Sequence, residues 1–211
     1  EFGISDNVPN SIECFDPKIG RWEPLRPSVV QRESPGVAAV GGKLYVFGGV
    51  GWDEAEEENS ETEEEEEFPS DDEDDRPNLC SMECFDPSTG EWAFKATMLR
   101  PLYNMGVAVL DGFIYAVGGC SDDTIRGRSS TLKCVYRYDS AADNWTQLQQ
   151  MHEQRWSPGV AALDGKIYVA GGHDGGNRTL SSTECYNAAT DEWNFLPHMH
   201  INRHMHCLVA M

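Results

Sequence analysis

Short apolar segments recur along the chain and predict β-strands. Three of them begin with Gly-Val-Ala, at residues 36–40, 106–110 and 159–163, and each is followed by a second apolar segment that ends in Gly-Gly. Apolar runs of this length are typical of strands, and a Gly-Gly or Asp-Gly pair between two of them is typical of a hairpin turn. Because Gly and Pro interrupt every candidate helical stretch, the pattern predicts an all-β protein built from hairpins.

A second phrase alternates with these hairpins. It contains Glu-Cys-aromatic or a variant, then an Asp or Asn, a turn, and a tryptophan six residues after that Asp or Asn: Trp22, Trp92, Trp145 and Trp193. From each of the first three tryptophans to the next Gly-Gly the spacing is 26 residues. The phrase predicts a third and a fourth strand for each repeat. Four short strands in a repeat of roughly 50 residues are typical of a β-propeller blade.

The Gly-Gly doublet, the tyrosine three residues before it and the distal tryptophan resemble the kelch repeat, and most closely the kelch domain of BTB-kelch (kelch-like) proteins. The resemblance implies an all-β, kelch-type β-propeller of four-stranded antiparallel blades. We expect an incomplete section of one, with three full units and a partial unit at both ends. The expected parts are a partial blade at 1–34, blades at 35–97, 98–150 and 151–197, and the first strand of a further blade at 198–211.

Charge is concentrated in one insert of the first full unit. The net charge is −20, and 16 of the 23 residues at 53–75 are acidic. We expect this insert to be disordered, because like charges repel and it has almost nothing to bury. It allows two interpretations: a solvated spacer, or a guard that competes with acidic partners or recruits a basic one. The remaining surface has no basic face for nucleic acid, and no apolar run is long enough to span a membrane.

Function in a propeller is expected in the loops between strands. Two sets of loops, those after the Gly-Gly and those before each first strand, should share one face. In kelch-like adaptors such loops commonly bind a peptide of a protein partner. An arginine in them could instead bind loop carbonyls of its own chain. The candidate partner-binding residues are Arg32, Ser34, Trp52, Tyr103, Asn104, Arg155, Trp156, Ser157, His173, Asp174, Arg178, Arg203 and His204.

The resemblance implies a protein-interaction module, the substrate-recognition domain of a cullin-RING ubiquitin ligase adaptor, with the cullin bound through a BTB domain outside this chain. A cytoskeletal, actin-binding kelch protein is the alternative, and an enzyme on the same scaffold is a third reading. We find none of the common catalytic or phosphate-binding motifs and expect no cofactor. Four C-terminal histidines suggest a metal site, but chance clustering explains them better. The seven cysteines fit a reducing cytoplasm, so we expect a cytoplasmic location, with an association with the cytoskeleton as the alternative.

Overall fold

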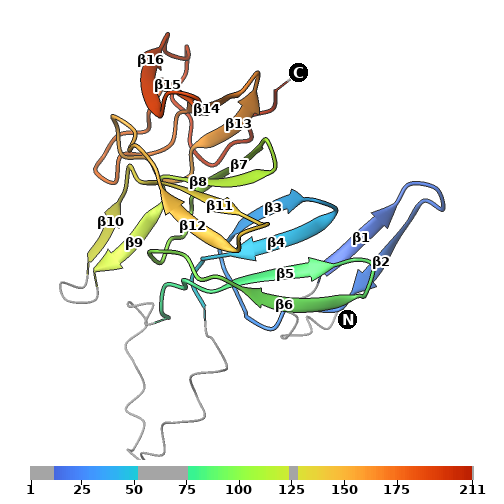
Figure 1. The fold of residues 1–211 in the computed structure, drawn as a ribbon. Helices are drawn as coiled ribbons and strands as arrows, with labels where there is room; N and C mark the ends of the chain where they lie inside the picture. Colours follow the sequence, from blue (N-terminus) through green and yellow to red (C-terminus); the bar gives the residue numbers. More distant parts are fainter. Residues whose placement is uncertain (1–11, 52–75, 124–127, 211) are drawn as a thin grey trace, which may run out of the picture.

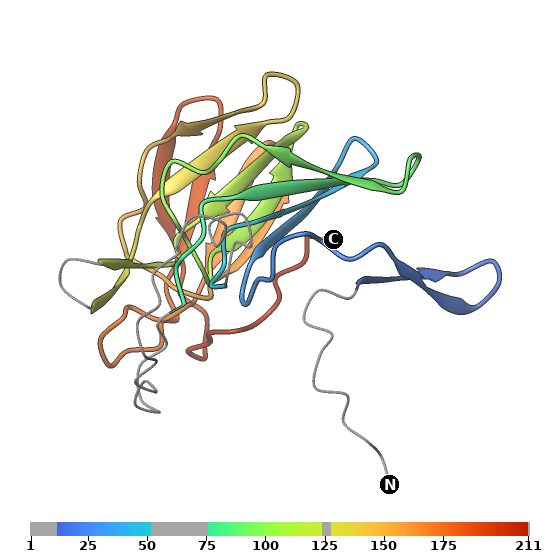
Figure 2. The same ribbon diagram turned by 90° about the horizontal axis from the view of Figure 1, so that it is seen from below.

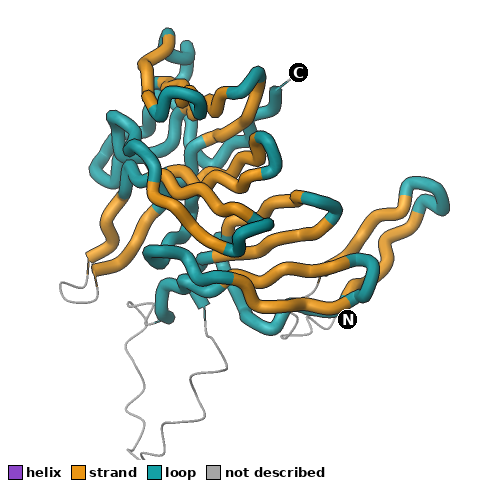
Figure 3. The backbone as a smooth tube through the Cα atoms, viewed as in Figure 1, coloured by secondary structure: helices purple, strands orange, loops and turns teal. Residues whose placement is uncertain are grey.

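The computed structural model describes residues 12–51, 76–123 and 128–210, and this part of the chain contains strands and loops but no helix (Figures 1 and 3). No helix able to cross a membrane is therefore present among these residues. The predicted acidic insert at 53–75 and the candidate residue Trp52 lie outside the described residues.

Three four-stranded antiparallel sheets follow one another along the chain, and we name them blades A, B and C. Blade A consists of β3 (Gly36–Val40), β4 (Lys43–Phe47), β5 (Met82–Asp86) and β6 (Glu91–Lys95). Blade B consists of β7 (Gly106–Leu110), β8 (Phe113–Val117), β11 (Val135–Asp139) and β12 (Asn144–Gln147). Blade C consists of β13 (Gly159–Leu163), β14 (Lys166–Ala170), β15 (Thr183–Asn187) and β16 (Glu192–Leu196). The predicted all-β fold with four-stranded antiparallel blades is confirmed.

Two hairpins stand beside these blades. The hairpin of β1 (Ile12–Asp16) and β2 (Arg21–Leu25) precedes blade A and forms the partial unit expected at the N-terminal end. A second hairpin, β9 (Cys120–Asp123) with β10 (Arg128–Thr131), extends from blade B where the sequence predicts a loop. Its strands carry no apolar alternation, so the sequence gives no signal for them. Their pairing satisfies backbone groups of a long excursion.

The doublet glycines are required where consecutive units approach each other. A Cβ atom added to Gly48 would lie 2.3 Å from the carbonyl oxygen of Leu102, in the loop that enters blade B. The equivalent atom on Gly118 would lie 2.3 Å from the carbonyl oxygen of Arg155. Both glycines also have positive φ angles, +62° and +67°. Only glycine satisfies both the space and the backbone conformation.

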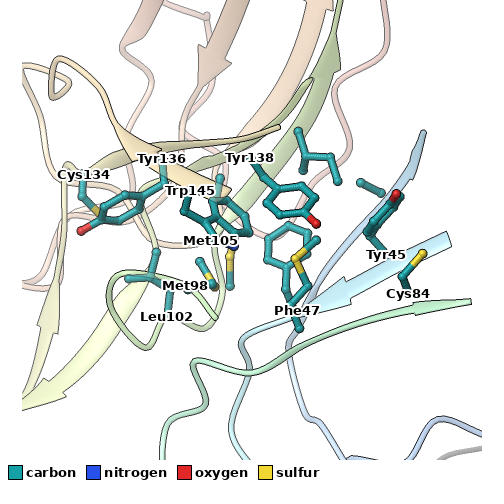
Figure 4. Close-up of a cluster of buried hydrophobic side chains, with 14 residues drawn as sticks. Tyr45, Phe47, Cys84, Met98, Leu102, Met105, Cys134, Tyr136, Tyr138 and Trp145 are labelled. Atoms are coloured by element: carbon teal, nitrogen blue, oxygen red, sulfur yellow. The ribbon is translucent and has the colours of Figure 1, made fainter. Parts of the chain in front are cut away.

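The core lies between the blades rather than within them. Blade A contributes Tyr45 and Phe47 and blade B contributes Tyr138 and Trp145 to one apolar cluster, in which the Phe47 and Trp145 ring centroids are 5.3 Å apart (Figure 4). A second cluster joins blade B to blade C in the same manner. Blade B therefore buries one face against blade A and the other face against blade C.

The recurrent tryptophan forms a hydrogen bond from each unit to the unit before it. The Nε1–H of Trp145 donates to the carbonyl of Ala96 at 3.1 Å, and that of Trp193 donates to Gln149 at 2.9 Å. In blade A, Trp92 donates to Arg26, just after the β1–β2 hairpin, at 2.9 Å. In every case the acceptor is the residue four places after the tryptophan of the preceding unit. The repeat in sequence is thus a repeat of one interblade contact.

The two ends of the molecule lack such neighbours. Figures 1 and 2 show the β1–β2 hairpin beyond blade A and blade C at the opposite end. The first strand expected within 198–211 is not formed in residues 198–210, which are irregular. This departure has a physical reason: a strand needs a neighbour for its N–H and C=O groups, and no further sheet lies beside this segment among the described residues.

Candidate partner-binding surface

The two predicted sets of loops meet in each blade. Backbone bridges join Trp156 to His173 in blade C, Tyr103 to Cys120 in blade B, and Glu33 to Val50 in blade A. We call the surface that they form the loop face: residues 31–34, 50–51, 76–79, 102–104, 120–122, 154–157, 173–179 and 202–204. The rigid blades thus hold loops that are far apart in sequence on one side of the molecule.

A chain of backbone hydrogen bonds runs across the loop face from unit to unit. The N–H of Asn104 donates to the Ser34 carbonyl at 3.2 Å, that of Ser157 to Asn104 at 2.8 Å, and that of Met205 to Ser157 at 3.1 Å. All four residues have φ angles between 47° and 53°, which non-glycine residues rarely adopt. The side chains of Ser34, Asn104 and Ser157 are partly exposed. These three candidates therefore occupy equivalent places in the three blades.

The most distinctive part of the loop face is a group of three rings at blade C. The Trp156 ring centroid lies 5.3 Å from that of His173 and 5.5 Å from that of His204, and the two histidines are 5.9 Å apart. His173 Nδ1 accepts the N–H of Gly175 at 3.1 Å. His204 Nδ1 lies 3.4 Å from the hydroxyl of Thr179. We call Trp156, His173 and His204 the ring cluster.

Asp174 and Arg178 lie next to the ring cluster but have different roles. The Asp174 carboxylate accepts the N–H groups of Gly176 at 2.9 Å and Arg178 at 3.2 Å, and these bonds, the Gly176 bond first, lower its pKa. Asp174 therefore fixes the loop. The Arg178 side chain is 73% exposed and its Nε is 3.9 Å from Asp174, so its guanidinium is available to a partner. A hollow of about 320 Å³ opens beside them, lined by Lys133, His152, Glu153, Gln154, Asp174, Arg178 and Leu180.

The loops of blades A and B are tied together by polar contacts. The Tyr103 hydroxyl donates to Asp122 at 3.2 Å, and the Asn78 side-chain amide of blade A donates to the same carboxylate at 2.8 Å. Arg76 forms an ion pair with Glu33 at 2.7 Å. Asp122 and Asn78 were not among the predicted site residues, although Asp122 lies in one of the predicted loops after the Gly-Gly.

The structure corrects the expectation that Arg32 and Arg155 contact a partner. The Arg155 side chain is 0% exposed; it donates to the carbonyls of Gly171 at 2.7 Å and Ser182 at 3.0 Å and pairs with Glu184 at 3.1 Å. Arg32 is almost as deeply buried and pairs with Glu83 at 3.2 Å in blade A. A partner has no access to either guanidinium. The two arginines hold the loops of the loop face in place and do not contact a partner.

The carboxylates that pair with these arginines carry a sequence signal that was overlooked. Glu83 and Glu184 are the Glu of the Glu-Cys phrase, and both are fully buried. The arginine and the glutamate occur together in blades A and C. Blade B lacks both, with Leu102 in place of the arginine and Tyr136 in place of the glutamate. Such covariation between repeats predicts a contact without any structure.

Arg203 occupies the same place before a first strand as Arg32 and Arg155. Its side chain is exposed and makes no ion pair or hydrogen bond within the described residues. Its backbone behaves as in the other units, since its carbonyl accepts the N–H of Gly172 at 2.7 Å.

No group of three or more His, Cys, Asp or Glu side chains in the described residues is placed to hold a metal ion. The histidines at the C-terminal end are dispersed: His198 lies near Ser181, His204 belongs to the ring cluster, and His206 packs against Gly159 and Gly171. Burial of His206 lowers its pKa, and neither ring nitrogen has a hydrogen-bond partner. The seven cysteines form no disulfide bond.

Comparison with known proteins identifies the repeat. The kelch motif matches residues 101–152 and 157–200, which form blades B and C. The chain is 33% identical to kelch-like protein 28 of Homo sapiens over 102 residues, 46% of this chain and 17% of that protein. It is 26% identical to kelch-like protein 35 of Mus musculus over 172 residues, 82% of this chain and 24% of that protein. For kelch-like protein 25 of Xenopus tropicalis the identity is 26% over 167 residues, 79% of this chain and 23% of that protein.

The chain thus spans less than a quarter of the length of these relatives. Kelch-repeat domains are generally non-catalytic protein-interaction modules. The matches agree with the tyrosine, Gly-Gly and tryptophan pattern and with the four-stranded blades. The chain is therefore similar to a section of a kelch-repeat β-propeller, and the relatives that it matches are kelch-like proteins.

Proposed function

We propose that this chain is the substrate-recognition part of a kelch-like adaptor for a cullin-RING ubiquitin ligase. The substrate protein would bind the loop face, and the cullin would bind a BTB domain outside these residues. The chain would then contribute no catalytic group of its own. The support is the similarity to kelch-like proteins along most of the chain, which is an argument from family resemblance.

The observation that carries the binding part of the proposal is the ring cluster together with the exposed Arg178. Trp and Arg are enriched among the residues that dominate protein–protein affinity, because they bury much surface and donate several hydrogen bonds. A backbone bridge holds Trp156 and His173 in fixed positions relative to each other, so little conformational freedom is lost when a partner binds. The adjacent hollow offers a place for a partner side chain.

Proximity labelling with the protein expressed from its own locus tests the assignment, because any flanking segments are then retained. We expect labelled cullin together with a small set of substrate proteins. Labelled actin without cullin would overturn the proposal in favour of a cytoskeletal protein. The proposal includes a cytoplasmic location, which imaging of the same tagged protein tests.

The loop face is tested with a recovered substrate by titration against purified variants. Replacing both Trp156 and His204 with alanine should weaken binding by about 30-fold or more, the loss of one hot spot of about 2 kcal/mol. Phe94→Ala, an equally drastic change at an exposed aromatic residue on β6, serves as the matched control and should leave affinity unchanged. Equal losses in both variants, or a loss in neither, would remove the ring cluster from the binding surface.

A further inference from the structure

A groove runs along the seam between blades B and C, beside the loop face. Its volume is about 950 Å³, and it is lined by Lys133, by the segment 147–152 that leaves β12, and by residues 191–194 around the start of β16. Met151 and Trp193 of this lining belong to the apolar cluster that joins the two blades, so blade packing fixes the shape of the groove. We call it the seam groove; it contains no residue of the loop face.

The seam groove adjoins the hollow on the loop face. Lys133 and His152 line both of them. His152 is held in place at this boundary, because its Nδ1 lies 2.8 Å from the Glu184 carboxylate. The hollow is also lined by Asp174, which directly follows one histidine of the ring cluster. The ring cluster, the hollow and the seam groove therefore adjoin one another in this order.

Three glutamines and a lysine in the seam groove have unused hydrogen-bonding groups. The side chains of Lys133, Gln147, Gln149 and Gln150 are exposed, and within the described residues none of them makes a hydrogen bond or an ion pair. The backbone is engaged, since the N–H and the carbonyl of Gln149 both form hydrogen bonds to blade C, at 3.1 and 2.9 Å. The fold therefore uses the backbone of this segment and leaves its amide side chains free for another molecule.

The connection between blades A and B has no such glutamines. At the three equivalent places after Trp92 it has Phe94, Ala96 and Thr97. The contact between the blades is nevertheless the same, since the Ala96 carbonyl accepts the indole N–H of Trp145 at 3.1 Å. Packing of the blades thus requires an amide at none of these places. A departure from the repeat that gathers polar side chains in one groove points to a ligand of that groove.

The chemistry of the lining favours an extended polypeptide. A glutamine amide has an acceptor oxygen and two donor hydrogens, which match the N–H and C=O groups of a main chain. An extended segment presents such groups, without internal partners, along its whole length. Small-molecule sites enclose their ligand mainly with apolar side chains, whereas every exposed side chain in the seam groove is polar.

We propose that the seam groove holds an extended segment of the partner protein that binds the loop face, a proposal that rests on the function proposed above for that face. In the complex, the ring cluster binds a side chain of the partner. The segment then continues through the hollow and along the three glutamines, which bind its main chain. The ring cluster discriminates among side chains, whereas main-chain contacts accept many sequences. The partner therefore presents its recognition motif within a chain that stays extended beyond the motif.

Selection of phage-displayed random peptides of about 20 residues on the purified full-length protein tests the proposal, since an extended chain of that length spans up to about 65 Å. Peptides that bind the Trp156→Ala, His204→Ala variant more weakly are retained. Gln149→Ala with Gln150→Thr gives the seam groove the residues of the connection between blades A and B. We expect fluorescence anisotropy to show that it weakens these peptides by about 10-fold or more, because two amides are lost.

Asn144→Ala with Thr146→Ala is the matched control, because it removes two exposed polar side chains of β12 outside the seam groove. It should bind the peptides as the wild type does. Shortening each peptide from either end then locates the segment in the groove. Removal of one end should abolish the effect of Gln149→Ala with Gln150→Thr and retain that of the ring-cluster variant, because the two sites bind different parts of the peptide.

The outcomes separate this proposal from binding at the loop face. Circular dichroism shows that each variant is folded as the wild type is. Peptides that are sensitive to the ring-cluster variant alone, or shortening that never separates the two effects, would overturn the role of the seam groove and leave the loop face as the binding surface. A selection without any peptide sensitive to the ring-cluster variant would overturn both.

Discussion

Blades B and C fill the same three positions with opposite chemistry. In blade C, Arg155, Ser182 and Glu184 form a buried polar network, in which Arg155 Nη2 lies 2.8 Å from Ser182 Oγ and 3.1 Å from Glu184. In blade B the equivalent residues are Leu102, Cys134 and Tyr136, and all are buried in the apolar cluster (Figure 4). The surrounding strands and loops are nevertheless alike. We call these three positions the junction of a blade. The space at the junction must be filled, but either ions or apolar groups can fill it.

The difference indicates that the buried arginine, serine and glutamate stabilise a blade only when all three are present. In blade C the Gly171 carbonyl accepts a guanidinium N–H at 2.7 Å, whereas the equivalent Gly118 carbonyl faces only the Cys134 thiol at 3.8 Å. Burial raises the pKa of that thiol to about 11, as expected for a dry apolar site. A buried ion pair often gives little net stability over apolar residues of similar size, but one ion left alone is costly.

Removal of one charge from blade C should have the largest effect on the free energy of unfolding. Arg155→Leu removes the guanidinium that pairs with the buried Glu184 carboxylate and leaves His152 Nδ1, at 2.8 Å, as the nearest side-chain partner of that carboxylate. We expect unfolding in urea to show a loss of about 3 to 5 kcal/mol. The control Arg178→Leu removes an exposed arginine and should change stability by less than about 0.5 kcal/mol. Equal effects of the two substitutions would show that the network contributes nothing.

Truncation of the apolar junction in blade B should cost somewhat less. Leu102→Ala removes a fully buried side chain and leaves a cavity, and the expected loss is about 3 kcal/mol by urea unfolding. This loss should not depend on pH, because the side chain that is removed is apolar. Leu99→Ala, three residues earlier and exposed, is the matched control. A pH-dependent loss for Leu102→Ala would mean that the junction of blade B also contains an ionised group.

The same comparison shows what a sequence can predict. The blades, their hairpin turns and the loops of one face follow from the spacing of glycines, tyrosines and tryptophans, because identical interblade contacts require identical residues. The ring cluster also follows in part, since Trp156, His173 and His204 were all candidates. Arg32 and Arg155 were candidates because they lie in these loops, and the structure shows the stated alternative, in which each arginine donates to carbonyls of its own chain.

What could not be predicted depends on contacts between distant segments. The burial of Arg155 requires Glu184, 29 residues later, and only the covariation between blades reveals the pair. The β9–β10 hairpin occurs in one blade and has no repeat to support it. The segment at 206–210 carries a strand sequence but lacks a partner strand, and sequence patterns do not report whether a partner is present.

Blades B and C each contain a hydrogen bond from a tyrosine hydroxyl to an aspartate carboxylate, and blade A does not. The Tyr138 hydroxyl donates to Asp143 at 2.6 Å and lowers the pKa of that carboxyl, whereas blade A has Phe85 and Gly90 at these places. Tyr138→Phe should cost about 1 kcal/mol near neutral pH. A depressed folded pKa stabilises above the unfolded value of about 4, so the cost should fade as the pH drops below it. Tyr168→Phe is the control, and a pH-independent cost for Tyr138→Phe would contradict this reasoning.

Exchange of the complete set should have the smallest effect of all. The triple variant Arg155→Leu, Ser182→Cys, Glu184→Tyr gives blade C the junction residues of blade B, and we expect its stability to stay within about 1 kcal/mol of the wild type. The reason is that the buried ions Arg155 and Glu184 are removed together and a similar volume is filled, while Glu153, which also pairs with Arg155 at 2.9 Å, is partly exposed to water. The single Arg155→Leu variant is the internal reference, since the triple variant should regain most of its loss. If urea unfolding shows the triple variant to be as unstable as the single one, the junctions of blades B and C are not interchangeable, and the local packing of each blade decides its chemistry.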